Sequence, residues 1–287
     1  MGLFGRGRES VPPHPRREPR IDLPLSLESL ERVFRDAVDF SKREVQLAGD
    51  PERVVTLCYI GGMARMERVN DYVLRPMAQD AGLLACPDMA AVMRRMELGA
   101  LYDLGVERRR DMDRAALDLV EGNCLLLFPG ESEVLSLNVG TEEKRSISAP
   151  ENETVLKGAR DAFVESLRTN TSLVRRHLKA PELKIKEQVV GRQSLTLVDV
   201  LYVEGITDPA LVSRVEAQLA ELDIDALLAT GNIEEYLADQ TRTPFPLLQH
   251  TERPDRLCGG LAEGRVGILV DGLPLGYLAP GVIGDFL

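Results

Sequence analysis

Few side chains of this 287-residue sequence stand where they could do catalytic chemistry. The three histidines, His14, His177 and His250, lack the spacing of metal ligands, and no GxSxG segment marks a serine nucleophile. Glycines end two strand-like runs, at Gly61–Gly62 and at Gly205, but neither turn has the spacing of a phosphate-binding loop. We interpret these glycines as tight turns between a strand and a helix. We therefore expect no catalytic residue, no metal and no cofactor.

Two polar segments could bind a small molecule. ESLRTN contains Arg168 and Asn170, and HTERPDR contains Glu252 and Arg253. Arg168 or Arg253 can clamp a carboxylate, such as that of an amino acid, while Asn170 or Glu252 orients the amine. These four residues are the candidate ligand-binding site.

A structural role for the second segment is the competing interpretation. Thr251 or Glu252 can cap the helix that Pro254 begins, and Asp255 and Arg256 can add a salt-bridge cluster. The pair Asp113–Arg114 repeats the Asp–Arg pair earlier in the chain. A duplicated helix start would keep its cap, so the repetition favours the structural role for Asp255 and Arg256.

Composition excludes several classes of partner. The net charge is −11, and because the first twenty residues carry +3, the remainder carries −14. That balance disfavours nucleic acid as a partner, and the absence of Trp disfavours base stacking or a carbohydrate platform. The four cysteines are widely spaced and mostly apolar in context, so we expect small buried hydrophobes in a reduced chain; a zinc site or a disulfide is the alternative. They are Cys58, Cys86, Cys124 and Cys258.

No segment of the sequence is typical of a secretory signal or a membrane span. Residues 1–24 are rich in Pro and Arg and predict a disordered basic arm, with contact to an anionic lipid surface as the alternative. The uncharged stretch Gly272–Gly284 is short and broken by Pro and Gly, whereas a spanning helix needs about 20 apolar residues. We expect the chain as given to be soluble, without a transmembrane helix.

The hydrophobic pattern changes between helical and strand periods in a fixed order, twice along the chain. A helix capped by Ser26 precedes two strands, several helices and a hairpin, and the second half repeats this order, with a helix start at Thr207–Pro209 and a type I′ hairpin turn at Asp271–Gly272. The predicted elements of the first half are strands 43–47 and 53–60, helices 66–77, 88–102 and 110–122, and the hairpin 124–139. Those of the second half include a helix 171–178, strands 183–189 and 195–205, and the hairpin 263–280.

Identical residues recur at an almost constant offset. Tyr59 and Tyr202 are 143 positions apart, and Glu121–Gly122 and Glu263–Gly264 are 142 apart. We infer an α/β fold of two duplicated small mixed α/β subdomains packed side by side, preceded by the disordered arm. Since a long crossover usually joins parallel strands, we expect parallel pairing and a cleft between the subdomains. The expected boundaries are 1–24 for the arm, 25–139 and 172–287 for the subdomains, and 140–171 for a partly helical connecting segment.

The same segments carry a family resemblance. In chain order they are CYIGGMARMERVNDYVLRPM, PENETVLKGARDAFVESLRTNTSLVRR, VLYVEGITDP, LDIDALLATGNIEEYL, TPFPLLQHTERPDR and LAEGRVGILVDGLPLGYLAP. Together, over about residues 36–280, they resemble the soluble N-terminal region of the A subunit of bacterial spore germinant receptors, the GerA spore germination family. The sequence departs from the family pattern at Ala159, where the family usually has Gly-Pro, and it ends at GVIGDFL, about where the family's membrane portion begins.

The resemblance implies a component of a nutrient receptor in the inner spore membrane. Its implied partners are the B and C subunits, other A subunits in a homo-oligomer, and an amino acid or other small nutrient. The implied function is a non-enzymatic domain that couples germinant sensing to an attached membrane channel. One alternative is an assembly module that contacts other subunits without binding nutrient. Another is a hydrolytic or lyase activity of Glu165, Glu252 or Asp255, which only the clustering of carboxylates supports.

Overall fold

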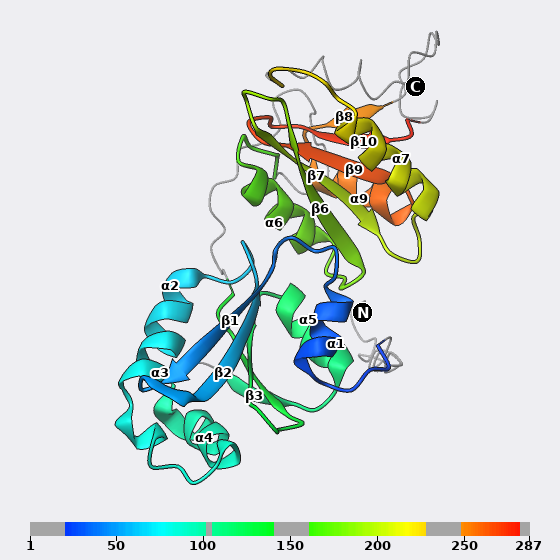
Figure 1. Cartoon of the computed structure of the whole chain (residues 1–287). Coiled ribbons are helices and arrows are strands. Elements are labelled where there is room, and N and C mark those ends of the chain that lie inside the picture. Colours follow the sequence, from blue (N-terminus) through cyan, green and yellow to red (C-terminus); the bar gives the residue numbers. More distant parts are fainter. Residues whose placement is uncertain (1–20, 102–104, 141–160, 228–247, 282–287) are drawn as a thin grey trace, which may run out of the picture.

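The computed structural model describes residues 21–101, 105–140, 161–227 and 248–281, which form two units of the same architecture (Figure 1). Each unit contains one five-stranded sheet with helices on both faces. The blue-to-green unit in Figure 1 holds residues 21–140 and the green-to-red unit holds residues 161–281. This arrangement confirms the expected fold class of two duplicated α/β subdomains.

The first unit begins with a short helix and a long two-stranded ribbon. Helices then lead to an edge strand, a second long helix and a final hairpin. In chain order the elements are α1 (Leu27–Val33), β1 (Phe40–Leu47), β2 (Asp50–Ile60), α2 (Met66–Arg68), the π-helix η1 (Val69–Leu74), α3 (Arg75–Gln79), the 3-10 helix η2 (Ala81–Leu83), α4 (Met89–Arg95), the π-helix η3 (Met96–Ala100), β3 (Val106–Arg109), α5 (Met112–Val120), β4 (Cys124–Leu127) and β5 (Val134–Leu137).

The second unit repeats this order with fewer described helices. Its elements are α6 (Leu167–His177), β6 (Leu183–Val190), β7 (Thr196–Val203), α7 (Pro209–Ala220), β8 (Gln249–Thr251), α9 (Pro254–Ala262), β9 (Val266–Val270) and β10 (Gly276–Ala279). The strand order is β1-β2-β4-β5-β3 in the first sheet and β6-β7-β9-β10-β8 in the second, so each strand has a counterpart. The first residue of β1, Phe40, and the first residue of β6, Leu183, are separated by the same offset of 143.

The expected parallel pairing is wrong. Within the described residues every pair of named strands is antiparallel. The reason is an edge strand in each unit, β3 or β8, that the sequence analysis did not foresee. That strand reverses the chain once more before the crossover helix, so β3 and β4 point the same way with β5 between them. Strands β3 and β4, which α5 joins, are therefore parallel, as are β8 and β9, which α9 joins, as expected for a crossover connection. They are not neighbours in the sheet, however, so no parallel pairing results.

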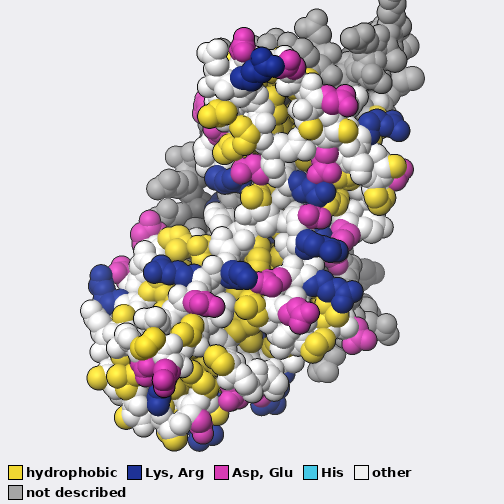
Figure 2. All heavy atoms as spheres, in the orientation of Figure 1, with side chains coloured by type: hydrophobic (Ala, Val, Ile, Leu, Met, Phe, Trp, Pro, Cys, Tyr) yellow, Lys and Arg dark blue, Asp and Glu magenta, His cyan; other side chains and the backbone are white. Residues whose placement is uncertain are grey.

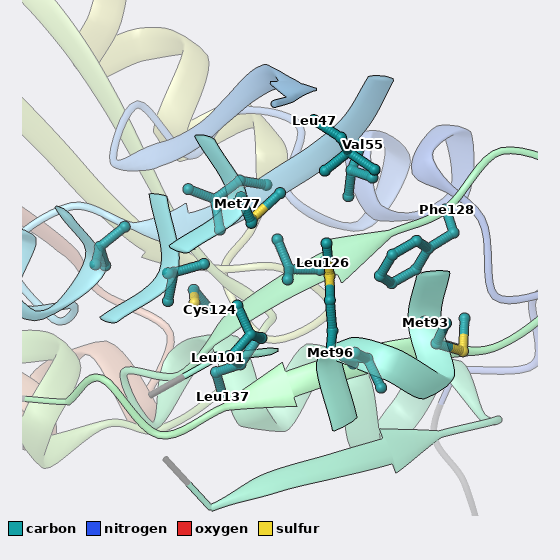
Figure 3. Close-up of a cluster of buried hydrophobic side chains, with 14 of the residues drawn as sticks. Leu47, Val55, Met77, Met93, Met96, Leu101, Cys124, Leu126, Phe128 and Leu137 are labelled. Atoms are coloured by element: carbon teal, nitrogen blue, oxygen red, sulfur yellow. The ribbon is translucent and has the colours of Figure 1, made fainter. Parts of the chain in front are cut away.

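Each sheet buries both of its faces, so its inner strands, such as β4 and β9, are buried at every residue. On one face of the first sheet, Leu126 and Leu137 pack with Met77, Met93 and Met96 from the helices α3, α4 and η3 (Figure 3). The other face packs against α1 and α5. In the second unit α7 covers one face, and α6 and α9 cover the other. The result is a three-layer α/β/α sandwich, made twice.

Local signals explain where several elements begin and where one turn departs from expectation. Ser26 caps α1 through the N–H of Ser29, and Asp208 caps α7 ahead of Pro209, both as the sequence predicts. The prediction of a type I′ turn at Asp271–Gly272 is wrong, because only Gly272 has a positive φ and five residues separate β9 from β10. Asp271 instead accepts a hydrogen bond from the N–H of Leu167, 3.2 Å away, at the start of α6.

The predicted domain boundaries stay predictions, but two details bear on them. Helix α6 begins at Leu167 and so crosses the expected boundary between residues 171 and 172. Ile21 and Leu23, at the end of the expected arm, pack against the α1–α5 face of the first unit. Residues 1–20, and most of the predicted connecting segment, lie outside the described residues.

Candidate functional site: the joint between the two units

A short segment of the first unit pairs with the edge of the second sheet. The residues between α1 and β1 lie parallel to β6, with Ala37 opposite Ile185. The N–H of Val38 donates to the carbonyl of Ile185 at 2.9 Å, and the N–H of Ile185 donates to the carbonyl of Asp36 at 2.8 Å. This pairing covers part of an edge that would otherwise expose unpaired backbone groups. We call this contact region, residues 33–39 with β6 and α6, the joint.

A buried ion pair holds the joint together. Arg175, on α6, donates from Nε to Asp39 Oδ2 at 2.8 Å and from Nη2 to Asp39 Oδ1 at 2.9 Å. The Arg175 side chain is fully buried and that of Asp39 is 3% exposed. A third bond, from Arg175 Nη1, reaches the carbonyl of Ala180 at 3.3 Å. The two-pronged geometry fixes orientation as well as distance between the units.

Two further contacts cross between the units. The buried ammonium of Lys184 donates to the carbonyl of Val33 and lies 3.2 Å from Glu204. Gly62, in the turn after β2, lies against α6 so closely that a Cβ there would stand 3.1 Å from the Cβ of Ser172. The turn therefore needs glycine both for its positive φ of 76° and for this close approach. Figure 1 shows α6 at the place where the two units meet.

Beside the joint, a second polar cluster lies between α6 and the sheet. The carboxylate of Asp199, on β7, is fully buried and accepts a hydrogen bond from the hydroxyl of Thr171 at 2.9 Å. Arg168 donates to Asp199 at 3.4 Å and also pairs with Glu187 on β6. Burial raises the pKa of Asp199 to about 6, because the Thr171 and Arg168 contacts offset only part of the desolvation. The polar face of α6 thus carries Arg168, Thr171 and Arg175 one helical turn apart.

The four ligand-binding candidates make contacts within the chain. Asn170 is fully buried, and its amide donates to the carbonyl of Val164 at 2.5 Å and accepts from the N–H of Val164 at 2.8 Å. Arg253 forms a two-pronged pair with Asp255, at 3.1 and 2.6 Å. The backbone carbonyl of Glu252 accepts from the N–H of Phe163 at 2.8 Å. The carboxylate clamp formed by Arg168, Asn170, Glu252 and Arg253 stays a prediction.

The segments ESLRTN, TERPDR and the β9–β10 turn meet around residues 161–166. Asn170 holds Val164, Glu252 holds Phe163, and the N–H of Gly272 donates to the carbonyl of Glu165 at 2.8 Å. Three motifs that are distant in the sequence therefore fasten one short stretch of chain to the second sheet.

The expected caps differ in detail from the structure. The N-cap of α9 is Arg253, which makes no side-chain cap, while the Thr251 hydroxyl accepts the N–H of Arg253 at 3.1 Å. Asp255 accepts the N–H of Arg256 at 2.9 Å, and Arg253 lowers the pKa of that carboxyl.

In the first unit, the N-cap of α5 is Asp111, two residues before Asp113, and it accepts the N–H of Arg114 at 2.7 Å. The Arg114 side chain extends to the buried Asp118, 3.2 Å away, which Arg109 also contacts at 2.5 Å.

Two of the hollows on the described surface stand out, and neither of these is lined by the four ligand-binding candidates. One, of about 380 Å³, lies at the joint between Ala37 and Glu216. The other, of about 740 Å³, lies among the helices of the first unit. In the described ranges no group of three or more His, Cys, Asp or Glu residues could hold a metal. Across those same residues, no helix has the length and apolar character needed to cross a bilayer.

None of the four cysteines is bonded to another in the structure, and the expectation that all are small buried hydrophobes is wrong for Cys86. Three are buried, and burial raises the pKa of each of their thiols to about 12. Cys86 is partly exposed, and its Sγ lies 3.5 Å from the carbonyl of Gly82.

The residues that build the joint were not predicted from the sequence. Asp199 had a signal, because a charge inside the apolar run LTLVDVLYV must be buried with partners. Arg175 also had one, since it lies seven residues after Arg168 on the same helix face. Asp39 had none, because its partner is 136 residues away in the chain.

The fold and the joint define a duplicated α/β module whose two units are fixed to each other. The family described as "Bacillus/Clostridium GerA spore germination protein" matches residues 28–287, so the chain belongs to the GerA family of spore germination proteins. The chain is similar to spore germination protein KA of Bacillus subtilis, with 32% identity over 245 residues, 85% of this chain and 44% of the relative. It is also similar to spore germination protein GerLA of Bacillus cereus, with 31% identity over 271 residues, 92% of this chain and 54% of the relative.

A crystal structure gives the same result for the fold. The N-terminal domain of the A subunit of the Bacillus megaterium spore germinant receptor GerK3 superposes with a TM-score of 0.69 at 28% identity, over 90% of this chain and 94% of that domain. The chain spans about half the length of the curated relatives it matches. One of those relatives, 35% identical over 224 residues, is a Bacillus subtilis membrane protein, YfkQ. The chain is thus a member of this family, and its fold is that of the N-terminal domain of a germinant receptor A subunit.

Proposed function

We propose that this chain is a non-enzymatic receptor module that couples germinant sensing to an attached membrane channel. The observation that carries the proposal is the joint, where a buried, oriented ion pair fixes two units that each have their own core. A change in one unit can reach the other through such a contact. The full receptor is proposed to lie in the inner spore membrane, with B and C subunits, other A subunits and a small nutrient as its partners.

The geometry of the acidic side chains supports a role without catalysis. Asp255 is paired with Arg253, which lowers its pKa and so keeps it charged at neutral pH, where it cannot act as a general acid. Asp199 has a pKa of about 6, in the useful range for acid–base work, but it is fully buried beneath α6. A substrate could reach Asp199 only if α6 left the sheet.

The test replaces one residue of the joint in the full-length protein, which is expressed from its native locus in the spore-forming host. Arg175→Met removes the cation and leaves Asp39 buried. Arg176→Met is the matched control, because Arg176 is the next residue on α6 but is not buried in the joint. Germination is followed by the fall in optical density of a spore suspension, and receptor abundance in the spore membrane by immunoblot.

We expect Arg175→Met spores to lose most of the nutrient response and Arg176→Met spores to keep it. The double variant Asp39→Leu/Arg175→Met, which removes both charges, separates coupling from folding, because it should restore receptor abundance without the oriented pair. Spores that carry Arg175→Met at the parent's receptor level and germinate at the parent's rate would contradict the proposal. Loss of co-purifying receptor subunits at normal abundance would instead favour the assembly role.

Nutrient recognition by the chain itself is tested separately. A ligand-observed NMR titration with amino acids, sugars and nucleosides is repeated with Arg168→Ala and with Arg253→Ala. Saturable binding that is lost in one variant would identify the carboxylate clamp. If no probe binds, recognition by this chain is excluded and only the coupling role is retained.

A further inference from the structure

The hollow of about 740 Å³ lies in the first unit, away from the joint. It lies among α3, α4 and the π-helix η3. That volume is within the range of small-molecule pockets in proteins, about 300 to 1,000 Å³. Helices α3 and α4 are each continuous with a π-helical turn, η1 before α3 and η3 after α4. Such turns are rare and frequently mark functional sites.

The charged side chains on its wall leave one positive charge unbalanced. Arg95 donates to Asp80 from Nε at 2.8 Å and from Nη2 at 3.0 Å. The guanidinium also lies over Gly82, where a Cβ would stand 2.2 Å from Arg95 Nη2, so this glycine leaves room for it. Arg94 is exposed, and within the described part of the chain it makes no ion pair. Two guanidinium groups therefore face one carboxylate in a chain whose net charge is −11.

Apart from Gln79, the rest of the hollow is lined by uncharged, apolar groups. Leu98 is 80% exposed, an unusual position for a leucine in a helical turn, and Pro76 and Ala91 line the same space. Gly99, with φ of 124°, ends the η3 turn beside Leu98. Figure 2 shows hydrophobic side chains, interspersed with charges, over these helices of the first unit. The wall thus combines an unbalanced cation with apolar surface that water solvates poorly.

We propose that this hollow binds a small organic anion with an apolar body, such as a branched monocarboxylate. Arg94 binds the carboxylate, while Leu98 and Pro76 contact the apolar carbons. Arg95 is held in place by Asp80 and Gly82 and adds to the positive potential. The hollow is concave, and only one large hydrophobic side chain of its lining stands free, which fits a compact ligand better than an extended peptide. The site is independent of the coupling role proposed for the joint.

The test titrates the chain with 4-methylpentanoate, observed by ligand NMR at low salt. Acetate supplies the charge without the body, 4-methylpentan-1-ol supplies the body without the charge, and leucine adds an ammonium group. We expect saturable binding of 4-methylpentanoate and at least tenfold weaker binding of acetate and of the alcohol. Arg94→Ala should weaken binding about tenfold or more, the usual effect of losing a hydrogen bond to a charged group. Leu98→Ala should weaken it as well.

Arg75→Ala is the matched control. Arg75 lies on α3 and pairs with Asp71 at 3.1 Å, but it does not line the hollow. Its replacement should leave the affinity within about twofold. The proposal is overturned if 4-methylpentanoate does not saturate up to about 20 mM, or if Arg94→Ala binds it as the parent does. It is also overturned if an acidic peptide binds at this site and the carboxylate does not.

Discussion

Replacing Arg175 by Met should destabilise the chain by several kcal/mol. The parent side chain is fully buried and makes three hydrogen bonds, two of them to Asp39, which is itself 3% exposed. Without the guanidinium, Asp39 is left as a buried charge with no counterion. Breaking a buried pair in this way typically reduces the free energy of unfolding by about 3 to 5 kcal/mol.

The size of the loss should depend on pH in a definite direction. The stranded carboxylate can escape its burial penalty by taking up a proton, which at pH 7 requires about 4 kcal/mol for a carboxyl of ordinary acidity. Each unit of lower pH reduces that requirement by about 1.4 kcal/mol. The difference in the free energy of unfolding between Arg175→Met and the parent, which we call the gap, should therefore narrow as pH falls from 7.5 to 5.

Urea denaturation followed by circular dichroism measures the gap at each pH. The double variant Asp39→Leu/Arg175→Met provides the comparison, because leucine branches at the same carbon as aspartate and no buried charge remains. The free energy of unfolding of the double variant should lie within about 1 kcal/mol of that of the parent, since an apolar replacement of a buried pair is often neutral or stabilising. A loss below about 1 kcal/mol in the single variant, or a gap that does not change with pH, would refute the reasoning.

Three further predictions follow from single contacts. Burial raises the pKa of Asp199 from 3.8 to about 6, so the protonated carboxyl stabilises the fold fully below pH 4 and this stabilisation is lost as pH rises through 6. The free energy of unfolding of Asp199→Asn, relative to that of the parent, should therefore rise by up to about 3 kcal/mol between pH 4 and pH 7. Equal pH profiles of the two proteins would contradict this. Gly62→Ala should lose about 1 kcal/mol more than the equivalent Gly205→Ala in thermal unfolding, because both have positive φ but only Gly62 meets Ser172; equal losses would show that the contact yields. In the folded chain a thiol reagent at pH 8 should label Cys86 first, since the other three thiols are buried, and mass spectrometry that finds several labelled sites would oppose this.

Much of the fold could be predicted from periodicity and turn chemistry. Ser26, Asp208 and Pro209 mark helix starts where the structure has them, and the offset between Tyr59 and Tyr202 indicates the duplication. These signals are local or repeated, so they can be recognised in the sequence without knowledge of the packing. The strand pairing was mispredicted because β3, with the sequence VERR, looks like a charged loop. Its ion pairs with neighbouring elements, such as Arg108 with Glu133 at 3.0 Å, replace the apolar pattern of an ordinary strand.

The joint was harder to predict because its partners come from different repeats. Nothing near Asp39 in the sequence indicates a buried counterion on α6. The duplication itself conceals this contact, since an internal comparison finds what the halves share, whereas the joint depends on what they do not share. The conspicuous motif residues Asn170 and Arg253 bind other parts of the same unit instead.

The parallel bridge between the segment before β1 and the edge strand β6 makes the two units unequal partners. By the offset of 143, the position equivalent to Val38 in the second unit is Pro181, which has no N–H to donate. A third unit placed after the second could not receive the hydrogen bond that Val38 gives to Ile185. The segment before β6 therefore lacks one of the two backbone donors and acceptors with which the segment before β1 holds the neighbouring sheet, so the two halves of the duplication are not interchangeable at this edge.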